Sequence, residues 1–157
     1  MQKINKKTKI MVLLMTVMST FILLNVSMKV AKAANYYDTS YCFSFVNGGD
    51  QRTQGREKHD ISGVYLYCYS SSNSNECFYA DVYGANNSVD NGTYCGNDRN
   101  YSVYEGDTYY MYNWVNENYS SDGRMAYAYI LGRASGNYVE DFSILWSPDN
   151  YQGYAGD

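Results

Sequence analysis

Few residues of this 157-residue chain could carry out catalysis. A Ser-His-Asp site would have to use His59, the one histidine, which lies beside Asp60 in a charged segment. No serine has the Gly-x-Ser-x-Gly surroundings of a nucleophile elbow. Acidic residues that could form a glycoside-hydrolysing pair fall mostly at turns, and the Asn- and Asp-rich stretches 86–92 and 96–100 suit at most a structural calcium ion. We therefore expect no catalytic residue, no metal site and no cofactor, with a small hydrolase as the weakest alternative.

One strand-like run carries the clearest binding signal. In Thr108–Glu117 the rings of Tyr110, Tyr112 and Trp114 recur at every second residue, which places them on one face of an extended strand. Such a strip could stack on the sugar rings of an extracellular glycan, with Asp and Asn side chains binding its hydroxyl groups. The alternative is that these rings fill a core, since Leu, Ile, Val and Phe number 17 beyond residue 33 while all 20 Tyr lie there.

Positive charge gathers in one polar segment. Asn47–Asp60 is rich in glycine and holds Arg52, Arg56 and Lys58, three of the six basic residues that follow residue 33. We expect a loop that meets an anionic partner, such as the phosphate groups of a cell-wall polymer. The alternative is a loop that only keeps the surface solvated.

An even set of cysteines indicates disulfides. The chain has Cys42, Cys68, Cys77 and Cys95, and four cysteines in a small exported protein are typical of two disulfide bonds. Three pairings are open, and the favoured one joins Cys68 to Cys77 and leaves Cys42 with Cys95. A zinc site is the alternative, but no Cys-x-x-Cys spacing supports it.

Residues 1–33 have the pattern of a secretory signal peptide. Four lysines precede residue 10, an apolar run covers Ile10–Val26, and Ala31-Lys32-Ala33 is a small-x-small cleavage site. The alternative is an N-terminal membrane anchor, because the apolar run is close to the length that spans a bilayer. No second apolar run follows, so we expect a secreted, extracellular protein whose mature chain, residues 34–157, has no membrane span.

The mature chain is strongly acidic. Six of the 12 Lys and Arg residues lie within residues 1–33 and all 16 Asp and Glu residues follow them, which leaves a net charge of −10. Nucleic acids and anionic membranes would repel such a chain, so we expect neither as a partner. The remaining 124 residues fit one domain.

Short runs of alternating residues predict an all-β fold. In the second run Val64, Leu66 and Cys68 face one way and tyrosines face the other. A Ser- and Asn-rich loop links this run to the next, which predicts a β-hairpin in which Cys68 opposes Cys77. About seven short strands with turn signals between them predict a single antiparallel β-sandwich without a long helix. The expected strands are Tyr41–Val46, Ser62–Ser70, Glu76–Gly84, Thr93–Cys95, Tyr101–Tyr104, Thr108–Glu117, Arg124–Gly132 and Phe142–Trp146.

Several segments of the chain resemble a family of small exported proteins of Gram-positive bacteria that is catalogued as a domain of unknown function (DUF2712-like). The segments that carry the resemblance are FSF at Phe43–Phe45, REKHDISGVYLYC at Arg56–Cys68, ADVYGANN at Ala80–Asn87, YNWVNEN at Tyr112–Asn118 and WSPDN at Trp146–Asn150. The family is similar, more distantly, to secreted β-sandwich bacteriocins of the lactococcin 972 type, which block septum formation. The resemblance implies export, a β-architecture and no assigned enzyme activity.

These observations lead to two expected functions. The first is an exported, non-enzymatic protein that acts at the cell envelope, either in the manner of a bacteriocin or by binding a wall component. The second is an extracellular carbohydrate-binding module. An exposed Trp114 side chain would favour the second function, and a buried one would argue against it.

Overall fold

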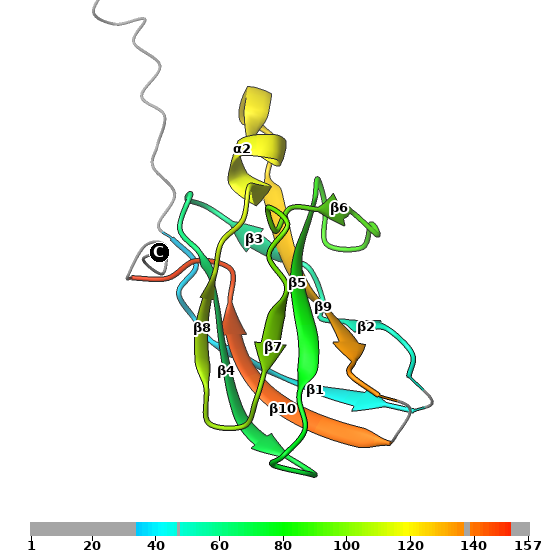
Figure 1. The fold of residues 1–157 in the computed structure, drawn as a ribbon. Helices are drawn as coiled ribbons and strands as arrows, with labels where there is room; N and C mark the ends of the chain where they lie inside the picture. Colours follow the sequence, from blue (N-terminus) through cyan, green and yellow to red (C-terminus); the bar gives the residue numbers. More distant parts are fainter. Residues whose placement is uncertain (1–33, 47, 137–138, 152–157) are drawn as a thin grey trace, which may run out of the picture. The chain divides into compact units, whose positions relative to one another are not determined.

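The structure is a computed structural model that describes residues 34–46, 48–136 and 139–151. The predicted signal peptide, residues 1–33, lies outside the described residues. Within the described part ten strands form two antiparallel sheets, which confirms the predicted all-β class (Figure 1). More strands are present than the seven or so expected, because the polar segment after the first strand contributes two short ones.

The two sheets share one core. Sheet A has the order β1 (Thr39–Phe45), β10 (Glu140–Ser147), β4 (Val64–Ser71) and β8 (Thr108–Met111). Sheet B has the order β2 (Gln51–Arg52), β9 (Ala126–Ala134), β5 (Phe78–Ala85) and β6 (Thr93–Tyr94), while β3 (Arg56–Lys58) also pairs with β9 and β7 (Tyr101–Val103) also pairs with β5. The helix α2 (Val115–Tyr119) and the 3-10 turn η1 (Ser121–Gly123) precede β9. Among the described residues no helix is long and apolar enough to cross a membrane.

Phenylalanine, rather than tyrosine, forms the centre of the core. Phe43 and Phe45 of β1 contact Phe78 of β5, and Phe78 contacts Phe142 of β10 with ring centroids 5.0 Å apart. All four rings are fully buried. Of the described tyrosines, one, Tyr129, is buried, and the others lie partly or fully at the surface. The alternative that tyrosines fill the core therefore holds fully only for Tyr129, while Tyr41, Tyr101, Tyr109 and Tyr119 pack against the core from partly exposed positions.

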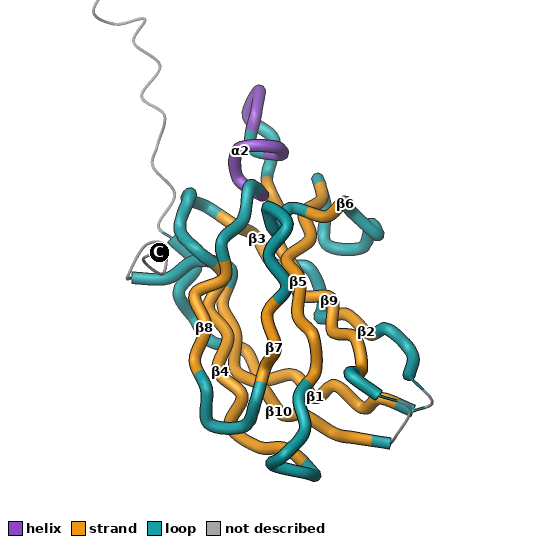
Figure 2. The backbone as a smooth tube through the Cα atoms, viewed as in Figure 1, coloured by secondary structure: helices purple, strands orange, loops and turns teal. Residues whose placement is uncertain are grey.

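The predicted hairpin between the second and third strands does not form. Strand β4 has β10 on one edge and β8 on the other, while β5 pairs with β9, β7 and β6 in the other sheet. Ser72, just after β4, bonds to the backbone of Asp141, which holds the chain at the edge of β10 before it crosses over. The loop that follows takes the chain from one sheet to the other (Figure 2).

The predicted disulfides are also absent, because all four cysteines are free. Cys68 lies in the core on sheet A, while Cys77 directly precedes a strand of sheet B, so the two do not oppose each other across a hairpin. Cys42 is exposed on β1, on the face opposite Phe43, and Cys95 is buried beside Gly84 and the side chain of Asn118. The pairing of Cys42 with Cys95 therefore fails as well.

Candidate functional site

A buried ion pair joins three parts of the chain. The Lys58 ammonium lies 3.2 Å from the Asp149 carboxylate, and both side chains are fully buried. Lys58 also donates to the main-chain carbonyl oxygens of Ser62 (2.6 Å) and Pro148 (2.7 Å). The Asp149 carboxylate in addition accepts hydrogen bonds from backbone N–H groups, including that of Asn35 at 2.7 Å. A pair with this many partners offsets its desolvation and serves the fold rather than a ligand.

Three of the five segments that carry the family resemblance meet at this ion pair. Asn150 donates its side-chain amide to the carbonyl oxygen of Gly63 (2.5 Å), and Asn113 donates to the carbonyl oxygen of Ser62 (3.3 Å). Asn116 reaches the carbonyl oxygen of Lys58 at 3.4 Å. The WSPDN, YNWVNEN and REKHDISG segments thus share one buried polar cluster, and the resemblance rests largely on residues that hold the sheets together.

The three cations of the predicted basic binding loop have partners within the protein, and one of them, Lys58, is buried. Arg52 donates to the carbonyl oxygens of Val89 and Asp90 in another loop. Arg56 donates to the carbonyl oxygens of Trp146 and Tyr37, and its guanidinium lies over the Trp146 ring at 5.3 Å. Burial lowers the pKa of Lys58, and Asp149 partly offsets this effect. Each of the three cations donates to main-chain carbonyl oxygens of other segments and so holds those segments in place.

The predicted strip of Tyr110, Tyr112 and Trp114 is divided between two places. Strand β8 ends at Met111, and the buried side-chain oxygen of Asn113 accepts a hydrogen bond from the Val115 N–H, which turns the chain into α2. Tyr112 and Trp114 remain together as an edge-to-face pair with centroids 5.3 Å apart. Trp114 is 41% exposed, the outcome that favours glycan binding.

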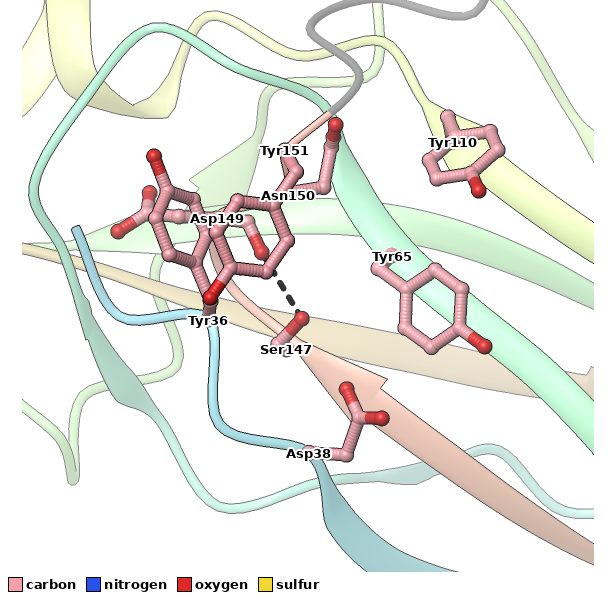
Figure 3. Close-up of a pocket in the computed structure, with 8 residues that line it drawn as sticks. All are labelled: Tyr36, Asp38, Tyr65, Tyr110, Ser147, Asp149, Asn150 and Tyr151. Atoms are coloured by element: carbon pink, nitrogen blue, oxygen red, sulfur yellow. Dashed lines mark hydrogen bonds between the residues drawn. The ribbon is translucent and has the colours of Figure 1, made fainter.

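Tyr110 lies in a hollow that we call the tyrosine pocket (Figure 3). It has a volume of about 170 Å³. Tyr65 and Tyr110 are cross-strand partners on β4 and β8, and their ring centroids are 5.7 Å apart. Tyr36 and Tyr151 come from the two ends of the described chain, and their ring centroids are 3.9 Å apart. The lining residues are Tyr36, Asp38, Tyr65, Tyr110, Ser147, Asp149, Asn150 and Tyr151.

A larger hollow of about 410 Å³, the sheet B pocket, lies on the outer side of sheet B. Phe78, Ala80 and Val82 turn one face of β5 into the core, and the residues between them form the opposite face. The pocket is lined by Asp81 and Tyr83 of β5, Arg133 of β9, Tyr94 of β6, and Asp98 and Asn100 of the following loop. It is therefore built from three strands and one loop.

Aromatic rings form one wall of the sheet B pocket. Tyr83 and Tyr94 are register partners whose rings meet edge to face at 5.8 Å. Tyr83 also stacks on Tyr129, its partner on β9, at 5.7 Å. The guanidinium of Arg52 covers the far side of Tyr129 at 5.2 Å. These contacts hold the Tyr83 and Tyr94 rings in place beside the pocket.

The polar wall holds a carboxylate with one oxygen unused. Asp81 is 1% exposed, and its Oδ2 pairs with Arg133 at 2.5 Å, while its Oδ1 is buried without a hydrogen-bond partner. Arg133 also donates to the side-chain oxygen of Asn100 at 3.0 Å. Burial raises the pKa of Asp81, and the charge of Arg133 partly offsets this. A buried carboxylate oxygen without a donor costs free energy, so a hydrogen-bond donor that reached it would be stabilising.

The sequence of β5 carries a signal for this site. Asp81 stands among tyrosines on the outward positions of a strand whose inward positions are apolar. An acidic residue there can pair diagonally with a base on the neighbouring strand, here Arg133. Asn97 and Asp98, with φ angles of 52° and 57°, adopt the left-handed conformation that Asn and Asp tolerate.

Other residues with catalytic potential have ordinary partners. The His59 ring nitrogen Nε2 lies 3.0 Å from the Glu57 carboxylate. Across the described ranges, no three His, Cys, Asp or Glu side chains are grouped in a way that could hold a metal ion. The stretch 96–100, considered for calcium, contributes instead to the sheet B pocket.

Comparison with known proteins gives a family and no function. No curated protein and no solved structure matches the chain. A family described as "Protein of unknown function (DUF2712)" matches residues 29–150. The match ends with Asn150, the last residue of the segment that closes the buried polar cluster. The chain therefore belongs to the DUF2712 family.

Proposed function

We propose that this protein is exported and binds a glycan of the cell envelope, without catalysis, through the sheet B pocket. The observation that supports this most is the unpartnered, buried Oδ1 of Asp81 in a pocket that also has two tyrosine rings. A volume of about 410 Å³ lies in the range of small-ligand sites.

The chemistry of the pocket suits a sugar ring. Asp81 would accept a hydrogen bond from one hydroxyl group, and the half-exposed guanidinium of Arg133 would donate to a neighbouring one. The apolar face of the sugar would lie against Tyr94. Two acidic residues, Asp81 and Asp98, and one basic residue, Arg133, line the pocket, so the site disfavours an anionic ligand and suits a sugar without negative charge.

The exposed Trp114, together with the half-buried Tyr112 that packs against it, would extend the binding surface. The loop that carries Asp98 and Asn100 also carries Arg99, whose guanidinium lies over the Tyr112 ring at 5.3 Å. A polymer bound at the sheet B pocket would then continue along this loop toward Trp114. Two aromatic contacts on one chain raise affinity through effective concentration.

Export through a signal peptide cleaved after Ala33 is part of the proposal. Two residues beyond that point, the Asn35 backbone N–H donates to the buried carboxylate of Asp149. Its side chain donates to the carbonyl oxygen of Glu57 and accepts from Arg56. The segment that would become the new amino terminus thus takes part in the fold.

A bacteriocin-like action has less support than glycan binding. The basic segment expected to meet an anionic envelope partner offers such an action little, because Lys58 is buried and Arg52 and Arg56 are bonded to main-chain carbonyl groups. A protein that inhibits growth would need another surface. Binding to an envelope glycan remains compatible with a role at the septum.

Affinity electrophoresis tests the glycan site. The protein purified from the culture medium, with Ala34 expected as its first residue, is run through gels that contain neutral wall polysaccharides. We expect retardation that Tyr94→Ala and Asp81→Asn each reduce, because the first removes the stacking ring and the second the charged acceptor. Removing one stacking contact alone costs about 1 kcal/mol, or roughly fivefold in affinity.

Tyr69→Ala is the matched control, because Tyr69 lies on β4 of the other sheet and is 45% exposed against 37% for Tyr94. Equal losses in the two tyrosine variants, with folding intact by circular dichroism, would contradict the proposed site. If no wall polysaccharide slows the migration of the wild-type protein, glycan binding itself is contradicted. Release of reducing ends during incubation would contradict binding without catalysis.

A further inference from the structure

The tyrosine pocket differs chemically from the sheet B pocket. Four of its eight lining residues are tyrosines, two are aspartates, and none is basic. Figure 3 shows Tyr36 and Tyr151 on one side and Tyr65 and Tyr110 on the other, with the carboxylate of Asp38 below them in this view. The negative faces of aromatic rings and a carboxylate both attract positive charge.

The polar groups at the back of the pocket already serve the fold. Ser147 donates its hydroxyl group to the Asp149 carbonyl oxygen at 2.8 Å, which is the dashed line in Figure 3. Asn150 donates its side-chain amide to Gly63, and the Asp149 carboxylate is paired with Lys58. What the pocket offers a ligand is therefore mainly ring faces and the exposed Asp38 carboxylate.

The nearest bases do not neutralise this preference. Burial lowers the pKa of Arg56, and the charge of nearby Asp38 offsets part of this effect. Its hydrogen bonds, however, go to the carbonyl oxygens of Trp146 and Tyr37 and to the side-chain oxygen of Asn35. No basic side chain lines the described pocket to repel a bound cation.

We propose that the tyrosine pocket binds an alkylammonium group, with a quaternary ammonium such as that of choline as the preferred ligand. The cation lies among the tyrosine rings, and Asp38 supplies the opposite charge. A volume of about 170 Å³ fits a small charged group better than a sugar chain. This site is separate from the sheet B pocket and does not depend on glycan binding.

Isothermal titration with two isosteric probes tests the proposal. Choline carries the charge, and 3,3-dimethyl-1-butanol has the same shape without it. We expect choline to bind and the neutral alcohol to bind roughly 10-fold to 30-fold more weakly. Equal affinities would show an apolar hollow without cation recognition, and the absence of binding by choline would overturn the site.

Variants locate the binding. Tyr151→Ala and Asp38→Asn should each weaken choline binding about 3-fold to 30-fold. Tyr37→Ala is the matched control, because Tyr37 is 84% exposed against 83% for Tyr151 and does not line the pocket. An equal loss in Tyr37→Ala, or none in Tyr151→Ala, would place the cation elsewhere and overturn the proposal.

Two further arms separate the sources of the ligand and the two sites. If the protein sediments with phosphatidylcholine vesicles and free choline releases it from them, a lipid headgroup is the source of the ligand. Choline binding without sedimentation would identify a free or polymer-attached ammonium group. Tyr94→Ala should leave choline binding unchanged, so that failure of the glycan site and failure of this site are distinguishable.

Discussion

Lys58 is the residue on which the buried polar cluster depends. Its ammonium group touches two carbonyl oxygens and the Asp149 carboxylate, and no water-exposed surface remains on its side chain. Removing the cation would leave the carboxylate buried without its charged partner. The cluster therefore makes a basic residue, which the sequence placed in a surface loop, part of the interior.

Lys58→Met should destabilise the protein strongly. Removing one member of a buried pair costs about 3 to 5 kcal/mol, a large share of the 5 to 15 kcal/mol typical of a domain. The urea midpoint measures the loss, with Arg124→Met as the control because Arg124 is exposed. A midpoint for Lys58→Met that equals the control would show that the pair adds nothing to stability.

Cys68 should make stability depend on alkaline pH. Burial raises the pKa of its thiol from 9.0 to about 11. Between these values the unfolded chain loses the proton and the folded chain keeps it, so stability is fully present below pH 9 and falls as pH rises toward 11. We expect a loss of about 1 to 3 kcal/mol in urea unfolding, and Cys68→Ala should flatten this slope.

A thiol count provides the control for Cys68. In the native protein a thiol reagent should react with the exposed Cys42, and in urea with all four cysteines, since all are free. A count of zero in urea would show disulfides and contradict the structure. An equally steep slope in Cys68→Ala would assign the pH dependence to other groups.

At the scale of elements, the alternation of apolar and polar residues predicted where strands form but not which strands pair with each other. The strand near residues 62–70 and the one near 76–84 are both present, with the buried positions that alternation indicates. The short loop between them suggested a hairpin, yet both edges of β4 are taken by β10 and β8. Which strand pairs with each edge of β4 depends on strands that are distant in sequence, and the alternation of residues within β4 holds no information about them.

Gly132 tests the packing of the two sheets. A Cβ added to this residue of β9 would lie 2.8 Å from the ring of Phe43, which belongs to the central phenylalanine cluster. Gly132→Ala should therefore lower the urea midpoint by an amount equivalent to about 1 to 3 kcal/mol. Gly49→Ala is the control, since its Cβ would lie 3.9 Å from the carbonyl oxygen of Val46, an ordinary contact distance. Equal midpoints for both variants would contradict the close contact of the sheets.

At the scale of the whole molecule, fold class was predictable and the sites were not. The strands and the acidic composition follow from local sequence. The candidate sites combine residues that are distant in the chain, such as Asp81 with Arg133 and Tyr36 with Tyr151. The predicted aromatic strip failed as a unit because Asn113 ends the strand, a role that only its buried contacts reveal.

The central claim is that an envelope glycan binds on the outer side of sheet B. The most direct measurement is a map of backbone amide shifts by nuclear magnetic resonance as a retarding polysaccharide fragment is added. We predict that the largest shifts occur at Asp81, Tyr83, Tyr94, Asn100 and Arg133, and that Asp81→Asn removes them. Shifts that centre on another surface, or that persist in Asp81→Asn, would contradict the account.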